Sequence, residues 1–160
     1  MKLKDVFDHL DLTEHIEGGY YRRSYCSDKK LNTNTGQALA SSIYYLLTTK
    51  RPTGHFHKNT SDILHFYHGG GTVRFHLLSK EGQYSTHIMG TDISRGQVLQ
   101  LFVAGDTWKA SELISSPFSL ISEVVVPEFR FEDMVLAKQG DLAALIKEKP
   151  ELERLLHNSP

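Results

Sequence analysis

Short runs of β-branched and aromatic residues, separated by turn residues, fill the middle of this 160-residue chain. Runs of Ile, Val, Tyr, Phe and Thr bounded by Gly, Pro, Asn and Asp are typical of β-strands. They predict strands at residues 39–48, 63–67, 72–78, 84–89, 98–103, 107–113, 118–126 and 129–137. Many short strands joined by tight turns suit a sandwich or a barrel. The sequence therefore predicts an all-β fold.

Helices are expected only at the two ends of the chain. Residues 4–10 carry a short amphipathic pattern, and residues 141–156 repeat Leu and Ile at helical intervals around Pro150. Proline interrupts a helix because it lacks an amide hydrogen. No Pro-, Gly- or Ser-rich linker divides the chain, whose length suits one hydrophobic core. We expect a single domain over residues 1–160.

Charge and hydropathy exclude two classes of partner. Lys and Arg number 18 against 19 Asp and Glu, so the basic excess that nucleic-acid binding needs is absent from the sequence. The longest apolar runs, such as residues 43–47, are far shorter than the roughly 20 residues that cross a bilayer. Asp5 stands where the apolar part of a secretion signal would begin. We expect a cytoplasmic protein that binds neither nucleic acid nor membrane.

Histidine is concentrated in one stretch, since six of the nine histidines lie between His55 and His87. His55 and His57 are two residues apart, so in extended backbone both point to one face of a strand. Asp62 follows five residues later. Two imidazoles and one carboxylate form a frequent ligand set for a divalent metal. The spacing makes His55, His57 and Asp62 candidate metal ligands, with two solvent-facing or backbone-bonded histidines as the alternative.

The same residues also suit proton transfer without a metal. Imidazole titrates near neutral pH, so His57 is a candidate general base that Asp62 would orient and make more basic. A tyrosine would act as the partner acid, and the candidates are Tyr20, Tyr45 and Tyr67. His57 and Asp62 are therefore the candidate catalytic residues.

The alternation of side chains along the predicted strands indicates which further side chains line a pocket. Leu64, Phe66 and His68 form the more apolar side of one strand, and Val73, Phe75 and Leu77 that of the next, so these sides are expected to face the core. His65 and His76 would then line a polar cavity or face solvent. Gln100 lies among apolar neighbours, where it either reaches a ligand or bonds to the backbone.

Tryptophan stands where a returning strand would be expected to supply a further histidine. The indole nitrogen of Trp108 has no free lone pair and does not bind a metal, but the ring stacks well on planar ligands. This favours ligand binding over metal catalysis. The candidate ligand-binding residues are Tyr45, His65, His76, Gln100, Phe102 and Trp108.

A segment dense in Tyr and Arg, residues 15–25, precedes the predicted strands. Such residues supply a pocket rim, an anion clamp or an interface anchor, because they offer large contact area and directed donors. A solvated edge strand is the alternative, with Gly18 and Gly19 as a simple turn.

Several blocks occur in an order typical of one known group of proteins. They are residues 15–22, 43–47, 56–58, 61–65, 96–97, Gln100, 103–108, 119–127 and 129–133. On these blocks the chain resembles the cupin superfamily and, within it, the single-domain cupin-5 family of unknown function. The resemblance implies a double-stranded β-helix, or jelly roll, assembled as a homodimer with a pocket at one end of the barrel.

Relatives on this fold include deoxysugar epimerases, isomerases, dioxygenases and binding proteins, so the fold does not decide the function. Measured against the general cupin pattern, His55, His57 and Asp62 match the first motif with Asp in place of Glu. Trp108 occupies the histidine position of the second motif. Measured against the narrower family, Ile63 replaces an acid and His65 replaces an aromatic residue.

Three functions remain open at this point. The first is binding of a small polar, sugar-like ligand in the barrel, with epimerase- or isomerase-type proton transfer. The second is a metal-dependent dioxygenase or isomerase that holds a divalent metal with His55, His57 and Asp62. The third is a non-catalytic module that binds or senses a small molecule. We rank the pocket with proton-transfer chemistry above the metal enzyme.

Overall fold

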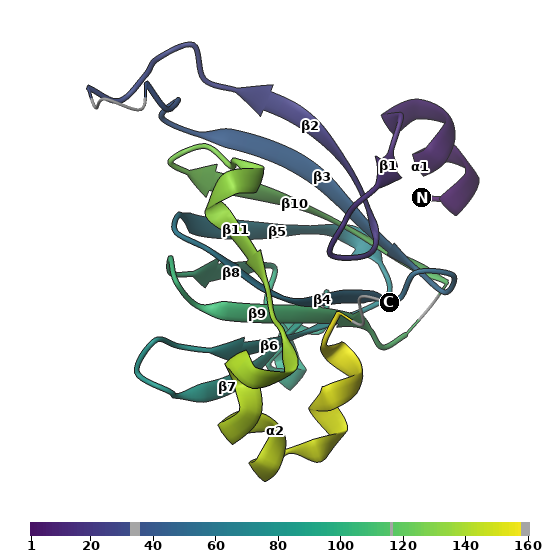
Figure 1. The fold of residues 1–160 in the computed structure, drawn as a ribbon. Helices are drawn as coiled ribbons and strands as arrows, with labels where there is room; N and C mark the ends of the chain where they lie inside the picture. The colour runs from purple at the N-terminus through teal and green to yellow at the C-terminus, as the bar shows by residue number, and fades with distance from the viewer. Residues whose placement is uncertain (33–35, 116, 158–160) are drawn as a thin grey trace.

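The computed structural model describes residues 1–32, 36–115 and 117–157, in which two antiparallel sheets face each other (Figure 1). The larger sheet has the spatial order β1 (Thr13–Glu14), β2 (Tyr20–Cys26), β3 (Ser41–Thr48), β10 (Phe118–Val126), β5 (Asp62–Gly70) and β8 (Gln100–Val103). The smaller sheet has the order β11 (Met134–Leu136), β4 (Thr53–Asn59), β9 (Trp108–Leu113), β6 (Val73–Leu78) and β7 (Tyr84–Met89). The predicted all-β jelly roll is confirmed.

Helices occur at both ends of the chain, as predicted. They are α1 (Leu3–Leu10) and α2 (Ala143–Glu148), with the 3-10 turns η3 (Gln139–Leu142) and η4 (Pro150–Leu155) on either side of α2. Pro150 ends the α-helical part, and the chain continues as the tighter η4 turn. Two further 3-10 turns lie between strands, η1 (Ile93–Arg95) and η2 (Phe131–Asp133). Among the described residues, no helix is long and apolar enough to cross a membrane.

Apolar side chains from both sheets meet in the main core. Its buried members are Tyr45, Leu47, Val73, Phe75, Leu77, Met89, Leu101, Val103 and Ile121. The predicted inward face of β6 is therefore confirmed. The predicted inward face of β5 is wrong, because Ile63 and His65 are buried while His68 is exposed. His65 lies inside because its hydrogen-bond partners, the Leu101 carbonyl and Lys109, are there.

Several segments differ from the predicted strands. The strands β1 and β2 precede the first predicted strand, and the largely exposed β2 matches the solvated strand that was the alternative for residues 15–25. The strand β4 was not predicted, because its sequence is mostly polar and contains Gly54. The predicted strand 129–137 is wrong over most of its length. Only Met134–Leu136 pair with β4, while Phe131–Asp133 form η2. The rings of Phe129 and Phe131 pack edge to face, with centroids 5.0 Å apart, instead of alternating across a sheet.

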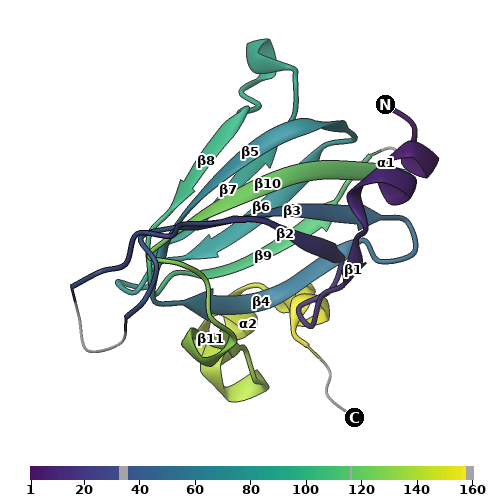
Figure 2. The same cartoon turned by 90° about the horizontal axis from the view of Figure 1, so that it is seen from above.

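The C-terminal segment, residues 139–157, covers the outer face of the smaller sheet (Figure 2). Its leucines pack on Phe56 and Ala110 of that face. One carboxylate, Glu112 on β9, joins the two layers: it accepts hydrogen bonds from Arg74 at 3.2 Å and His76 at 3.0 Å, and it pairs with Arg154 of η4 at 2.7 Å. Burial alone would raise the pKa of Glu112, but Arg154 and His76 outweigh burial and lower this pKa to about 2.

The low pKa of Glu112 predicts a pH-dependent contribution to folding stability. Its pKa in the folded chain lies below the usual value of 4.5, so the carboxylate stabilises the fold above about pH 4.5 and loses this effect as the pH falls toward 2. We expect Glu112→Gln to lower the free energy of unfolding at pH 7 and to flatten its fall between pH 5 and 2. Urea unfolding across this pH range measures both effects.

The matched control is Glu148→Gln on the exposed side of α2. We expect its stability curve to follow that of the wild type at every pH. A Glu112→Gln curve parallel to the wild-type curve would contradict the assignment of Glu112 as the acid-sensitive link.

The homodimer that the resemblance implies stays a prediction.

Candidate functional site

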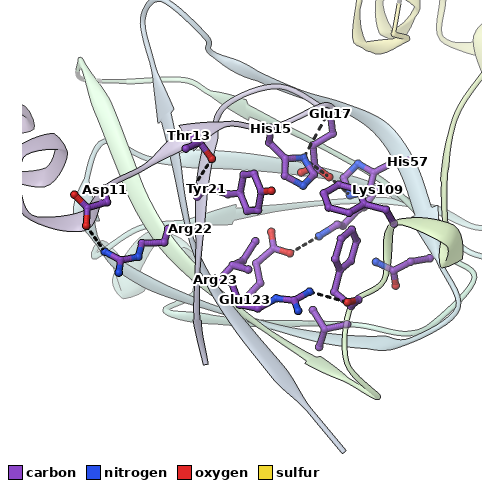
Figure 3. A pocket seen from close by; sticks show the side chains of 15 residues that line it. Asp11, Thr13, His15, Glu17, Tyr21, Arg22, Arg23, His57, Lys109 and Glu123 are labelled. Carbon is purple, nitrogen blue, oxygen red and sulfur yellow. Dashed lines mark hydrogen bonds and ion pairs between the residues drawn. The ribbon is translucent and has the colours of Figure 1, made fainter. Parts of the chain in front are cut away.

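A cavity of about 440 Å³ opens at one end of the barrel and is lined by residues of both sheets (Figure 3). This volume lies in the range of small-molecule sites. The lining combines charged, aromatic and apolar side chains: Asp11, Thr13, His15, Glu17, Tyr21, Arg22, Arg23, Ile43, His57, Asn59, Lys109, Glu123, Val125, Phe129 and Phe131. Buried ionisable groups therefore meet at the inner end of a ligand-sized space.

A glycine turn holds the N-terminal segment in this cavity. Gly18 has a φ of 110°, and a Cβ there would lie 2.0 Å from the Thr53 backbone oxygen, so only glycine fits. The Tyr45 hydroxyl donates to the Gly18 carbonyl at 2.9 Å, and Arg51 donates to the carbonyls of Gly19 and His15. The turn thereby fixes the backbone on either side of Glu17.

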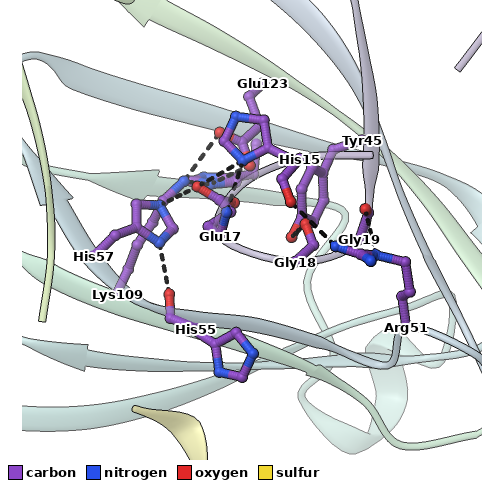
Figure 4. A network of polar contacts seen from close by, with 11 residues as sticks. His15, Glu17, Gly18, Gly19, Tyr45, Arg51, His55, His57, Lys109 and Glu123 are labelled. Carbon is purple, nitrogen blue, oxygen red and sulfur yellow. Dashed lines mark hydrogen bonds and ion pairs between the residues drawn. The ribbon is translucent and has the colours of Figure 1, made fainter. Parts of the chain in front are cut away.

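A β-bulge in β4 separates the two histidines of the predicted metal motif. Gly54 pairs with Ser111 and His57 pairs with Lys109, so the β4 side of this stretch contains one extra residue. The extra residue breaks the alternation of faces that normally places residues i and i+2 together. His57 points into the cavity, whereas the ring of His55 points away from it (Figure 4) and contacts His157.

The Glu17 carboxylate is the closest acidic partner of His57, with Oε2 2.9 Å from Nε2. The other ring nitrogen, Nδ1, lies 2.7 Å from the His55 backbone oxygen, which can only accept, so Nδ1 carries a proton. A second proton must lie between Nε2 and the carboxylate. Burial alone would raise the pKa of Glu17, but His57 outweighs it and lowers this pKa. The pair is therefore a carboxylate facing an imidazolium.

The ring of His15 lies beside this pair, with Nδ1 3.5 Å from Glu17 Oε2. The Glu17 backbone N–H donates to His15 Nδ1 at 3.3 Å, so the ring proton sits on Nε2. Burial lowers the pKa of His15. The ring stacks on Phe131 and meets Tyr21 edge to face, with centroids 5.9 and 4.5 Å away. His15 thus connects the charged inner end of the cavity with its aromatic mouth.

Lys109 links the two sheets inside the barrel. It is only 3% exposed, and its Nζ donates to Glu123 Oε2 at 2.9 Å and to His65 Nε2 at 3.0 Å. Nδ1 of His65 donates to the Leu101 carbonyl, so Nε2 is free to accept. Burial and Lys109 lower the pKa of His65. Burial alone would raise the pKa of Glu123, but Lys109 outweighs burial and holds this pKa well below its usual value.

The structure brings one of the three predicted metal ligands, His57, to the cavity lining. Asp62 is exposed, and its carboxylate accepts a hydrogen bond from the Gly105 N–H, where it closes the turn before β9. His55 is on the outer side of the bulge. The acid beside His57 is thus Glu17 rather than Asp62.

The predicted ligand-binding residues lie in several places. His65 and Tyr45 are buried inside the barrel, His65 against Lys109 and Tyr45 against Gly18. Gln100 and Phe102 are exposed on the outer face of the edge strand β8, Phe102 by 56%. Two others lie under the C-terminal segment. His76 bonds to Glu112 and Tyr84, and Trp108 packs near α2 and η4 with the Lys58 ammonium over its ring.

The buried charged residues of the lining were not among the sequence candidates; within the described part of the chain they are Glu17, Lys109 and Glu123. Glu17 lies in the Tyr- and Arg-rich segment that was proposed as a pocket rim. Glu123 lies in the otherwise largely apolar β10. Lys109 follows Trp108 on β9, so the two side chains point to opposite faces of the sheet. A charged residue at an inward position of a buried strand was the available signal, since such groups are rarely buried without a partner.

The donor set does not fit the metal that the cupin resemblance suggests. Among the described residues, no group of three or more His, Cys, Asp or Glu side chains is arranged to hold a metal ion. At the inner end of the cavity an ammonium group, Lys109, already engages Glu123 and His65. A divalent cation there would face a fixed positive charge.

The Lys109 ion pair predicts a large effect on stability. Replacing Lys109 with Met leaves the Glu123 carboxylate buried without its cation, which costs about 3–5 kcal/mol of unfolding free energy. We expect Lys109→Met/Glu123→Gln to recover most of this loss, because it removes the unpaired charge. Chemical unfolding of both variants measures the difference.

Lys58→Met is the matched control, since Lys58 lies over the Trp108 ring on the outer face. It should cost about 1 kcal/mol or less. A double variant as unstable as Lys109→Met would argue against the buried ion pair.

Comparison with known proteins finds a family and several individual proteins to which this chain is similar. The profile of the family described as Cupin superfamily (DUF985) matches residues 4–137. The uncharacterised protein YML079W of Saccharomyces cerevisiae is 36% identical over 155 residues, which cover 87% of this chain and 77% of the yeast protein.

Two solved structures have the same architecture over almost their full length. Protein SO0799 from Shewanella oneidensis is 32% identical with a TM-score of 0.89, and the match covers 99% of both chains. A hypothetical protein from Leishmania major is 25% identical with a TM-score of 0.89, over 99% of this chain and 100% of that one. Neither name states an activity.

Proposed function

The chain belongs to the cupin superfamily, in the family described as DUF985, and on this premise we propose that it binds a small polar ligand in its barrel and transfers a proton on that ligand. The reaction class would be an isomerisation or epimerisation. The observation that carries the proposal is the Glu17–His57 pair at the inner end of the cavity, where a carboxylate and an imidazolium share a buried proton.

The positions of the protons in the Glu17–His57 pair decide which of the two residues is the base. Both nitrogens of His57 already have acceptors, the His55 carbonyl and Glu17, so the ring cannot take a further proton. Glu17 is therefore the proton acceptor, and His57 holds it ionised and oriented. This differs from the sequence prediction, in which His57 was the base and Asp62 its partner. General acid–base catalysis of this kind contributes about 100- to 10,000-fold to a rate.

Tyr21 is the tyrosine best situated to return a proton. It lines the cavity and packs against His15. Tyr21 was not among the three tyrosines proposed from the sequence. Of those three, Tyr45 donates to the Gly18 carbonyl and Tyr67 to the Gly70 carbonyl, while Tyr20 packs edge to face on Phe7. The proposed epimerase-type proton transfer therefore depends on Glu17, His57 and Tyr21.

A non-catalytic binding module is the second candidate. The specific observation in its favour is that the charged side chains at the mouth are already paired, Arg22 with Asp11 and Arg23 with the Phe129 carbonyl. Such a mouth is suited to hold a ligand by shape and hydrogen bonds. This module would bind without turnover.

Deuterium exchange separates the two candidates. In D₂O we expect the wild-type protein to place deuterium next to the carbonyl of at least one member of a panel of aldoses, ketoses, their phosphates and small hydroxyketones. Glu17→Gln should slow this exchange at least about 100-fold, because an amide cannot accept the proton. NMR of the panel measures the exchange, and calorimetry measures binding.

Glu81→Gln in the exposed turn between β6 and β7 is the matched control and should exchange at the wild-type rate. Saturable binding without any exchange would replace the enzyme by the binding module. Exchange that persists unchanged in Glu17→Gln would remove Glu17 from the mechanism.

A further inference from the structure

We propose that Lys109 is the carbonyl-oxygen subsite of the cavity and that the ligand is therefore an aldehyde or a ketone. This inference rests on the proposed function and deepens it. It names the group on the ligand that the inner end of the cavity recognises, and it gives Lys109 a role that the ion pair alone does not require.

The first argument is an account of hydrogen-bond donors. An ammonium group has three N–H bonds. Within the described part of the chain, Lys109 donates to two acceptors, Glu123 Oε2 and His65 Nε2. Lys109 is 3% exposed and lines the cavity, so bulk water has little access to the third N–H. A buried donor of this kind needs an acceptor, and a ligand oxygen in the cavity supplies one.

The second argument is an account of charge. The carboxylates of Glu17 and Glu123 carry two negative charges, and the Lys109 ammonium and the His57 imidazolium carry two positive charges. The inner end of the cavity is thus neutral. An anionic ligand group would add an uncompensated buried charge, which is costly. A carbonyl oxygen accepts the free N–H without adding one.

The third argument comes from strand register. Lys109 on β9 and His57 on β4 are directly paired across the smaller sheet, so their side chains leave the same face side by side. His57 in turn holds Glu17. Figure 4 shows the side chains of Lys109, His57 and Glu17 close together. A carbonyl oxygen on Lys109 therefore brings the carbon next to that carbonyl toward Glu17.

The chemistry of this arrangement balances without a further reactant. The C–H bond next to the carbonyl breaks and its proton moves to Glu17. The electron pair forms a C=C bond, and the carbonyl electrons move to oxygen as an enolate. Lys109 stabilises this developing negative charge, which is the contribution of a prearranged cation in such reactions. Return of the proton from Glu17 to either face of the same carbon completes an epimerisation. In a ligand with a hydroxyl group on that carbon, the hydroxyl proton can move to the enolate oxygen. Return of the proton from Glu17 to the former carbonyl carbon then forms the new C=O bond and completes an isomerisation.

Hydroxyacetone labelled with ¹³C at the carbonyl is the probe for this subsite, with 1,2-propanediol as its reduced counterpart. We expect the carbonyl resonance to move downfield on binding to the wild-type protein and to Glu17→Gln, since both retain Lys109. The shift should disappear in Lys109→Met/Glu123→Gln, which retains the fold without the buried unpaired charge. Deuterium exchange into the probe should fall at least about 100-fold in that double variant.

The readouts distinguish the subsite from the reaction. A wild-type carbonyl shift without deuterium exchange would overturn the proposed proton transfer and support the subsite. Exchange and carbonyl shift that both persist in the double variant would overturn the role of Lys109 and leave the proposed reaction standing. Equal affinity for hydroxyacetone and 1,2-propanediol, or no binding of either, would overturn the carbonyl subsite. Glu81→Gln again serves as the control for both readouts.

Discussion

Two carboxylates lie inside the barrel, and the arrangement of the cavity depends on the cations that neutralise them. An ionised carboxylate loses several kcal/mol of solvation on burial unless a partner compensates it. Lys109 reaches across from the smaller sheet to Glu123 on the larger one, and His57 meets Glu17. Each acid thus has its own cation. The main apolar core adjoins these pairs, since Tyr21 and Ile43 line the cavity and also pack against that core.

Local irregularities of the backbone bring the partners together. The bulge in β4 turns His57 inward and His55 outward, and the glycine turn at Gly18 returns the chain so that Glu17 lies beside His57. Bulges and turns with positive φ occur frequently at functional sites, because they aim side chains that a regular strand would point elsewhere. The site owes its geometry to these two departures from regular structure.

Sequence periodicity predicted most of the strands and the terminal helices, because alternation and turn residues are local signals. The His-x-His spacing drew attention to His57, which lies in the cavity lining. The partner of His57 was not predictable in this way. Asp62 is near in sequence, whereas Glu17 arrives through the topology of the larger sheet and a turn fixed by Tyr45 and Arg51. Trp108 and Lys109 illustrate the same limit, since one residue of register on β9 decides which side chain faces the cavity.

The state of the His57 ring tests the central claim most directly. Its ring nitrogens can be followed by ¹⁵N NMR of selectively labelled protein near pH 7, with His57→Gln to assign the signals. The account predicts that both nitrogens carry a proton, Nδ1 toward the His55 carbonyl and Nε2 toward Glu17. It also predicts that Glu17→Gln removes the proton from Nε2. An unprotonated Nε2 in the wild-type protein would contradict the buried imidazolium–carboxylate pair.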